Sequence, residues 1–401
     1  MERQAQHGTA ANVDLDIPDS DPVTTDLLWS TITMASDPID TPTANPTTAT
    51  SSTAKSSKKS NKSTTKSASI DDVDFEHTVL RPRGVIILQK HTELLYENAF
   101  AHFGTEKAPT SHKAAHYLGK HDPEIEVFLD GGSAFEKRIG IEYKTADSWR
   151  LVERRFSNLA IKYFLVQQLM DMDHDKNEIF LPERWDEESI QPDPATDWNA
   201  FPILAEDNDT KPFGFSLFPG AMYWLSLQAF KTQWTSVAIN YVHVHQGRAF
   251  APYMSAEYKR DFREPGGHRK GVNQMACSAI LSQYSRYKLR YRVMKARSDI
   301  TWTEEDSLAI RHYGLTICGA KFEVWLAEAQ VSKTGEWLGS KVRRVDQGEL
   351  KVEECVGNLV DWVNEIHHWG LGKYCEWVRE DVEALAKKDK RELPARGGVS
   401  A

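Results

Sequence analysis

Cysteine is scarce in this sequence, which has four cysteines among 401 residues: Cys277, Cys318, Cys355 and Cys375. No two of them have the CxxC spacing, and this argues against a disulfide scaffold and against a cysteine-rich zinc site. So few cysteines suit a reducing compartment. We therefore expect an intracellular protein, either cytoplasmic or nuclear.

Long apolar runs and an excess of basic residues are also missing. No uninterrupted apolar stretch approaches the roughly 18 residues that a membrane-spanning helix needs, so we expect no membrane association. The start, MERQAQHGTAANVDLD, has no apolar segment of the signal-peptide type. The 49 basic residues are outnumbered by 58 acidic ones, giving a net charge of −9, so any contact with nucleic acid must be local.

The composition divides the chain into a tail and a folded part. Between residues 41 and 70, 16 of 30 residues are Ser or Thr, and such a stretch cannot bury enough apolar surface to offset its conformational entropy. We therefore predict a disordered tail over residues 1–73. A single α/β domain is predicted over 74–387, with its core at about 150–381, and a frayed tail over 388–401.

Hydrophobic periodicity predicts the elements of this domain. Helices are expected over Leu151–Met172, Gly271–Lys295 and Val356–His368, the last of them ending at Gly370 as a C′ glycine. Strands are expected over 212–218, before the turn signal Pro219-Gly220, and over 237–244, 249–259 and 313–329, with 336–345 pairing with the last as a hairpin. The prediction is a mixed central sheet flanked by helices.

The segment from Phe250 to Asp261, FAPYMSAEYKRD, carries the clearest chemical pattern. Side chains two apart on a strand share a face, so Tyr253, Ser255, Glu257 and Lys259 are expected to point one way, away from an apolar face. A carboxylate beside an ammonium suits metal-assisted hydrolysis of a phosphodiester, in which the carboxylate holds a divalent cation and the ammonium stabilises developing charge. The alternative is a structural ion pair.

The order helix, strand, strand, E-x-K strand, helix, strand resembles the αβββαβ core of the PD-(D/E)XK nuclease-like superfamily, the restriction-endonuclease-like fold. The stretches APYMSAEYKRD, GVNQMACSAILSQYSRYKLR and DLVDWVNEIHHWGL are also similar to a group of uncharacterised fungal proteins thought to share that fold. The resemblance spans about 211–381. It implies that Glu257 and Lys259 are the catalytic carboxylate and lysine, that Gln274 lies beside them, and that Mg²⁺ is the cofactor.

The sequence departs from the family at one position. The family's second carboxylate belongs to a Pro-Asp pair at the start of the preceding strand, and the corresponding place here is Pro212-Phe213. Phenylalanine cannot bind a metal, so only Asp209 or Asp207 upstream could replace that ligand. A hard divalent cation with one carboxylate fewer is bound weakly. Retained hydrolysis and a degenerate, non-catalytic core are therefore both open, and the second is favoured.

Three other patterns have simpler interpretations. A second E-x-K, Glu142 and Lys144, lacks a strand-rich lead-in and is expected on a solvated surface. His243 and His245 could share one face of a strand as zinc ligands, but no third ligand has a recognisable spacing, so exposed histidines are preferred. His367 and His368 diverge by about 100° on a helix and are expected in packing near Trp362 and Trp369.

One dense basic cluster occurs in the folded part, with Tyr284, Tyr287 and Tyr291 among its residues. Its members are Arg286, Lys288, Arg290, Arg292, Lys295 and Arg297. They could contact nucleic acid, although on a helix they divide between two faces, whereas phosphate tracking prefers one stripe. The preferred interpretation is a helix end paired with the acidic residues 304–306.

The sequence leaves three hypotheses for the function of the protein: a degenerate binding or interaction module, a Mg²⁺-dependent nuclease, and a non-cleaving nucleic-acid binder.

Overall fold

The computed structural model describes part of the second of two units of the chain, Thr64–Ala401. The described residues are 72–89, 98–105, 127–167, 182–186, 219–227, 230, 244–245, 249–259, 266–297 and 301–392, with the backbone alone for 182–186, 244–245 and 388–392. The predicted tail over 1–73 lies almost wholly outside them, as do the predicted strand over 212–218 and most of that over 237–244.

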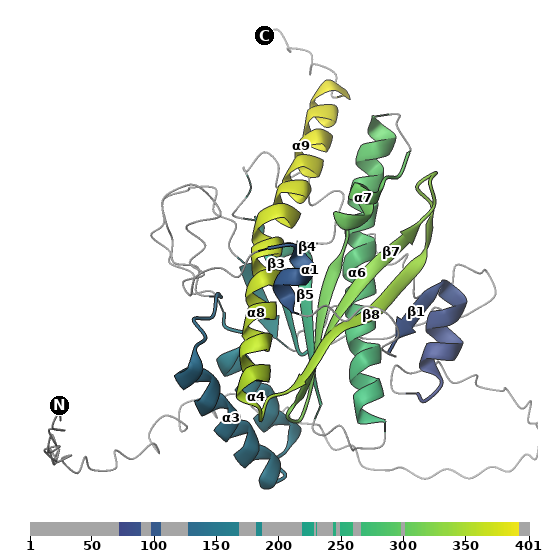
Figure 1. Cartoon of the computed structure of the whole chain (residues 1–401). Coiled ribbons are helices and arrows are strands. Elements are labelled where there is room, and N and C mark those ends of the chain that lie inside the picture. The colour runs from purple at the N-terminus through teal and green to yellow at the C-terminus, as the bar shows by residue number, and fades with distance from the viewer. Residues whose placement is uncertain are drawn as a thin grey trace, which may run out of the picture. The chain divides into compact units, whose positions relative to one another are not determined.

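A mixed sheet of eight strands forms the centre of the described structure (Figure 1). Its order is β1-β8-β7-β6-β5-β3-β2, and the short β4 pairs with β5. The pairs β1/β8 and β5/β6 are parallel and the others are antiparallel. The strands are β1 (Val85–Leu88), β2 (Pro182–Asp186), β3 (Ala221–Ser226), β4 (Val244–His245), β5 (Ala249–Lys259), β6 (His312–Cys318), β7 (Lys321–Val331) and β8 (Trp337–Glu349). The predicted α/β class with a mixed sheet is confirmed.

Helices cover both faces of this sheet (Figure 1). They are η2 (Glu76–Leu80), η3 (Arg81–Arg83), α1 (Ala99–Phe103), α3 (Ser133–Ser148), α4 (Glu153–Tyr163), α6 (Gly267–Ala296), α7 (Glu304–Leu308), α8 (Glu353–Trp369), η6 (Gly370–Tyr374) and α9 (Cys375–Glu392). Helix α6 packs on one face against β5, β6 and β7, and α3, α4 and α8 lie on the other. None of these helices has both the length and the apolar composition needed to cross a bilayer.

The long helix α6 can lie close to the sheet because a glycine faces it. A Cβ on Gly314 of β6 would be 2.2 Å from the Met275 sulfur, so only glycine leaves room for that side chain. Met275, Val272 and Ala276 are buried there with Trp224 and Trp325 from the sheet. Helix α6 thus packs against both β5 and its parallel neighbour β6.

Three predicted boundaries differ from the structure. The strand expected over 313–329 is two strands, β6 and β7, because Gly319 turns the chain with φ 61°. The helix expected over Leu151–Met172 is α4, which ends at Tyr163. The strand that pairs with β5 is β3, which begins after the turn signal Pro219-Gly220, where no strand was predicted; the predicted strand over 212–218 lies outside the described residues.

Gly370 does not end helix α8, contrary to the prediction. Its φ of −64° and ψ of −46° are helical, and the chain continues through η6 into α9, which reaches Glu392, beyond the predicted limit at residue 387. A Cβ on Gly370 would be 2.4 Å from the Tyr253 ring, so this glycine serves a close approach. Helix α9 continues because Val378 and Val382 are buried in the same core as Val293 of α6.

Candidate functional site

Strand β5 brings the predicted carboxylate and ammonium to the face that α6 covers. Its bounds, Ala249–Lys259, are those predicted from the sequence. The Lys259 side chain lies against α6, where a Cβ on Gly271 would be 3.1 Å from Lys259 Cγ. The Glu257 carboxylate is close enough to Cys277 of α6 to help raise the pKa of that thiol, after burial as the main cause. Glu257 and Lys259 therefore share a face, as expected.

Tyr253 does not share that face, and here the prediction is wrong. Its hydroxyl lies 2.9 Å from Nδ1 of His367 on α8, on the opposite side of the sheet. The cause is an irregularity in β5: Ala251 has φ 49°, and the register with β3 shifts between Tyr223 and Leu225. A bulge of this kind changes which face the following side chain occupies.

The ammonium of Lys259 lies between two carboxylates from different elements. Its Nζ is 3.9 Å from Glu257 Oε2 and 3.9 Å from Glu153 Oε1 of α4. Glu257 is only 3% exposed, whereas Glu153 is largely accessible. An ammonium this close stabilises a buried carboxylate in its charged form. Lys259 therefore connects α4 to the end of β5 as well as neutralising Glu257.

Gln274 lies on the same side of α6 as these groups. It is one turn after Gly271, which faces Lys259, and one turn before Cys277, which lies near Glu257. Gln274 is partly buried, and its Oε1 has no hydrogen-bond partner among the described residues. The structure thus brings together Glu257, Lys259 and Gln274, the three residues that the resemblance assigns to catalysis.

A second buried carboxylate, Glu323 of β7, was not predicted. Its Oε2 is 2.7 Å from His268 Nε2 and accepts a hydrogen bond of 3.0 Å from Thr316 Oγ1, while its Oε1 accepts one from Arg344. Burial raises the pKa of Glu323, but the hydrogen bonds and charges of His268 and Arg344 outweigh it, so the net shift is downward. Both oxygens are thus engaged by protein groups, which leaves Glu323 poorly suited to bind a metal.

Thr316 places this network next to the predicted site, because it is the register partner of Glu257 on β6 and also donates to Glu323. A sequence signal did exist: Glu323 alternates with the apolar Phe322 and Val324, so it had to face α6 with Trp325. Its partners His268 and Arg344 lie on two other elements, and their positions could not be read from spacing.

The family's second carboxylate has no counterpart on β3. That strand reads AMYWLS, all of it buried. Gly220 just before it has no room for a side chain, since a Cβ there would be 2.5 Å from the Tyr258 ring. Asp209, Asp207 and Phe213 lie outside the described residues. Within the described part of the chain, no group of three or more His, Cys, Asp or Glu residues is arranged to hold a metal ion.

The second E-x-K lies on a helix. Glu142 and Lys144 belong to α3, where residues two apart diverge by about 200°. Glu142 accepts a hydrogen bond from the Tyr163 hydroxyl, and Lys144 is exposed. The same three-letter pattern therefore produces no shared face here, and the expected solvated position is confirmed for Lys144.

The two predicted histidine pairs do not form a metal site in the described structure. His243 lies outside the described residues, and only the backbone of His245 is described. His367 is fully buried against Tyr223 and Tyr253, and burial, with the nearby His368, lowers its pKa to about 3. The His368 ring stacks near Phe128 and is 3.2 Å from Glu365 Oε1. The two histidines are therefore part of the packing, as expected, but the ring contacts of the described structure are with Tyr223, Tyr253 and Phe128 rather than with Trp362 and Trp369.

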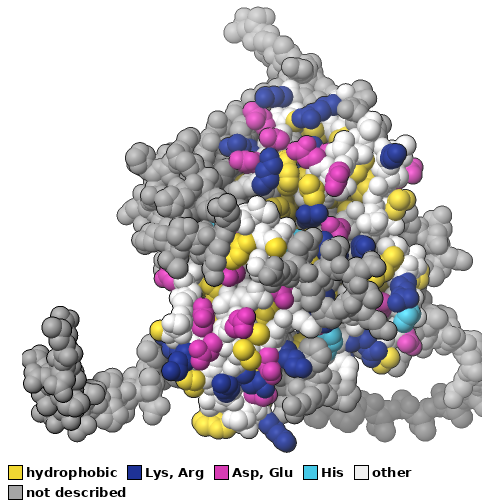
Figure 2. Space-filling view, in the orientation of Figure 1, with side chains coloured by type: hydrophobic (Ala, Val, Ile, Leu, Met, Phe, Trp, Pro, Cys, Tyr) yellow, Lys and Arg dark blue, Asp and Glu magenta, His cyan; other side chains and the backbone are white. Residues whose placement is uncertain are grey.

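The basic cluster on α6 is largely committed to ion pairs. Arg286 is 2% exposed and lies 2.5 Å from Asp381 Oδ2 of α9, and Arg290 reaches both Asp381 and Asp306 at 2.6 and 2.8 Å. The expected pairing with the acidic segment 304–306 is thus found at Asp306. On the face shown in Figure 2, basic and acidic side chains are interspersed. Arg286 and Arg290, two of the residues predicted to contact nucleic acid, are thus engaged by carboxylates of the chain itself.

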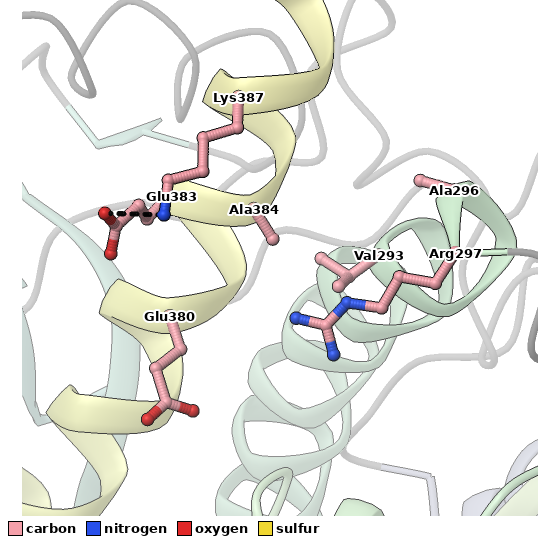
Figure 3. Close-up of a pocket in the computed structure, with 7 residues that line it drawn as sticks. All are labelled: Val293, Ala296, Arg297, Glu380, Glu383, Ala384 and Lys387. Carbon is pink, nitrogen blue, oxygen red and sulfur yellow. Dashed lines mark ion pairs between the residues drawn. The ribbon is translucent and has the colours of Figure 1, made fainter.

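A groove of about 470 Å³ separates the last turns of α6 from α9 (Figure 3). It is lined by Val293, Ala296, Arg297, Glu380, Glu383, Ala384 and Lys387, and Glu383 pairs with Lys387 at 3.1 Å. Val293 is 22 residues beyond Gly271, or about 33 Å along the helix axis at 1.5 Å per residue. The groove is therefore far from Glu257 and Lys259.

Comparison with known proteins gave no match: no family model, no curated protein and no solved structure is similar to this chain. The function must therefore be argued from the geometry.

Proposed function

We propose that this chain has a restriction-endonuclease-like core that has lost metal-dependent hydrolysis and serves as a binding or interaction module. The order of its elements supports the first part. Helix α4 is followed by β2, β3 and the E-x-K strand β5, and α6 then leads to β6, parallel to β5. Apart from the two-residue β4 between β3 and β5, this order agrees with the αβββαβ order that the sequence resemblance implies and so supports the proposal.

The observation that supports the loss of metal-dependent hydrolysis is the environment of the Glu257 carboxylate. Its neighbour strand β3 offers no carboxylate, and Tyr258 occupies the space where residue 220 would place a side chain. Divalent cations such as Mg²⁺ need several oxygen ligands in near-ideal geometry. A nearly buried carboxylate with an ammonium 3.9 Å away and helix α6 against it is arranged as a structural ion pair.

A nuclease remains the second candidate, because Glu257, Lys259 and Gln274 do converge on one side of α6. Labelled single- and double-stranded DNA and RNA, incubated with Mg²⁺ or Mn²⁺, separate the two functions. We expect the wild type to cleave no more than Glu257→Gln, which preserves the shape of the side chain. Cleavage that needs a divalent cation and is abolished in both Glu257→Gln and Lys259→Met would establish the nuclease instead.

The non-cleaving nucleic-acid binder has less support, since Arg286 and Arg290 already pair with acidic residues. A gel-shift titration in the same experiment tests it. Phosphate contacts make affinity fall steeply with salt. Salt-sensitive binding that Lys295→Ala and Arg297→Ala, two exposed changes, weaken without affecting stability would favour this function over the degenerate module.

A further inference from the structure

Strand β1 forms one edge of the described sheet and exposes apolar side chains. Ile86 and Leu88 are 49% and 37% exposed, and Leu338 at the start of the adjacent β8 is 58% exposed. Val85 and Ile87 alternate with them and are buried on the α6 face. Natural edge strands usually carry a charged residue, a proline or a bulge that prevents pairing with another chain, and β1, with the sequence VIIL, has none of these.

The unpaired side of β1 also presents backbone groups. Gly84 O accepts a hydrogen bond from Ser340 N, which fixes the phase of the parallel pair β1/β8. In such a pair alternate residues bond to the neighbour, so the N–H and C=O of Val85 and Ile87 point away from β8. Within the described part of the chain, no strand pairs with that side.

Two glycines hold β1 in a fixed position. Gly84 has φ +73° and Gly339 has φ +140°, and a Cβ on Gly339 would be 2.2 Å from Gly84 O. The backbones of β1 and β8 therefore approach where neither could carry a side chain. A fixed edge strand loses little conformational entropy when another strand pairs with it.

We propose that this edge joins two copies of the chain, with the two β1 strands antiparallel about a two-fold axis at Ile87. In this register Ile87 pairs with Ile87 of the second copy through its outward N–H and C=O, and Ile86 lies opposite Leu88. The exposed apolar side chains of β1 then face each other across the interface, while Val85 lies opposite Gln89, whose carbonyl accepts a hydrogen bond from Arg344. The charged neighbours Lys341 and Arg343 lie one strand inward, beside Ile86 and Leu88.

The area of the interface between the two β1 strands sets the strength of the dimer. Standard stable interfaces bury about 800 Å² on each partner, and a four-residue strand with two exposed apolar side chains, together with Leu338 of β8, offers less. The dimer is therefore in exchange with the monomer at micromolar concentrations and is not obligate. Because the side chains of β1 carry no charge, β1 pairs more favourably with a second copy of itself than with a charged segment of another protein.

The test is sedimentation equilibrium of the full chain at concentrations from about 1 to about 100 µM, where a weak interface of this kind is populated. We expect the wild type to shift towards dimer as the concentration rises. The exposed double change I86K/L88K places like charges opposite each other and should raise the apparent dissociation constant at least about tenfold. I141K, at a side chain of α3 that is 54% exposed, is the matched control and should leave it unchanged.

The register gives a sharper test. In I86K/L88E each lysine meets a glutamate of the other copy, so this variant should dimerise while I86K/L88K and I86E/L88E do not. Unfolding curves confirm that all variants are folded, which is expected because positions 86 and 88 are exposed. A wild type that stays monomeric throughout, or an I86K/L88E protein as dissociated as I86K/L88K, would overturn the proposal.

Discussion

The two faces of strand β5 bury ionisable groups in different ways. On the α6 face the buried carboxylates lie beside basic groups: Glu257 beside Lys259, and Glu323 of β7 beside His268 and Arg344. On the α8 face Tyr253 lies 2.9 Å from His367, and Tyr313 of β6 lies 2.9 Å from His102 of α1.

The histidines of the α8 face are neutral. Burial lowers the pKa of His367 and of His102 to about 3, with Arg311 and Arg343 adding to the effect at His102. The carboxylates of the α6 face are therefore matched with basic groups, whereas the α8 face is held by uncharged rings. A neutral ring also lies on the α6 face: His312 of β6 contacts Ser255 Oγ there, and burial lowers its pKa to about 3. We expect acid to weaken the carboxylate network and the neutral histidines in different pH ranges.

The largest expected effect is acid destabilisation through the neutral histidines. His102, His312 and His367 have pKa values lowered to about 3 from an ordinary 6.5, so below pH 6.5 the unfolded chain binds protons that the folded chain does not. Stability therefore falls as the pH falls. From pH 7.5 to 5.5 the loss is about 1.4 kcal/mol per histidine, or about 4 kcal/mol in all.

Urea unfolding at pH 7.5, 6.5 and 5.5 measures this loss. The free energy of unfolding of His102→Gln and of His367→Gln, each compared with the same variant at pH 7.5, should show about a third less pH dependence than that of the wild type.

Glu323 behaves differently, because its pKa is lowered in the folded state. Its contribution to stability is complete above its ordinary pKa of 4.5 and disappears only as the pH falls through the lower pKa of the folded state. A free energy of unfolding that is constant from pH 7.5 to 5.5 would contradict the neutral histidines.

Breaking the charged network of the α6 face should have the next largest effect. Arg344→Met removes a cation from Glu323, a carboxylate that is 2% exposed, and should cost about 3 kcal/mol. Adding Glu323→Gln to this variant should recover part of the loss, because the buried charge is then gone. If Arg344→Met cost no more than a typical surface change, the pairing would not be holding β7 and β8 as described.

A smaller effect is expected at the predicted site. Lys259→Met removes the ammonium beside Glu257 and should cost about 1–2 kcal/mol, since this ammonium is itself partly solvated and 3.9 Å away. The matched control is Lys144→Met in the E-x-K of α3, expected within about 0.5 kcal/mol of the wild type. A double-mutant cycle with Glu257→Gln isolates the pair, and zero coupling would show that the two groups do not interact.

The smallest effect is expected on the neutral face. Tyr253→Phe removes the hydroxyl that reaches His367 Nδ1 and should cost about 1 kcal/mol. Tyr291→Phe on α6 is the control, because no hydrogen bond of its hydroxyl contributes to the described packing. Equal unfolding free energies for the two variants would show that the Tyr253–His367 contact adds nothing to stability.

Much of the fold could be predicted because local periodicity determines it. Strand β5 has the predicted bounds, α6 extends the predicted helix by a few residues at its start, and β8 pairs with β7 as the expected hairpin. The errors have non-local causes. The pattern around Gly370 predicts a helix end, whereas the nearby Tyr253 ring explains the glycine, and the chain stays helical because α9 packs on α6.

Less of the candidate site could be predicted. The alternation of a strand predicted that Glu257 and Lys259 share a face, whereas the position of Gln274 beside them was implied only by the family resemblance. The bulge that turns Tyr253 away lies between Phe250 and Met254, and Pro252 within it is a sequence signal that the alternation pattern does not take into account. The partners of Glu323 come from α6 and β8, and those of Arg286 and Arg290 from α7 and α9, so only tertiary structure shows them.

The measurement that tests the loss of metal chemistry most directly is the thermal unfolding of the wild type and of Glu257→Gln with and without excess Mg²⁺ or Mn²⁺. A ligand that binds only the folded state at 100 times its dissociation constant stabilises it by about 2.7 kcal/mol. We predict that neither cation changes the difference in Tm between the two proteins. A cation-dependent rise in the Tm of the wild type that Glu257→Gln abolishes would contradict the account.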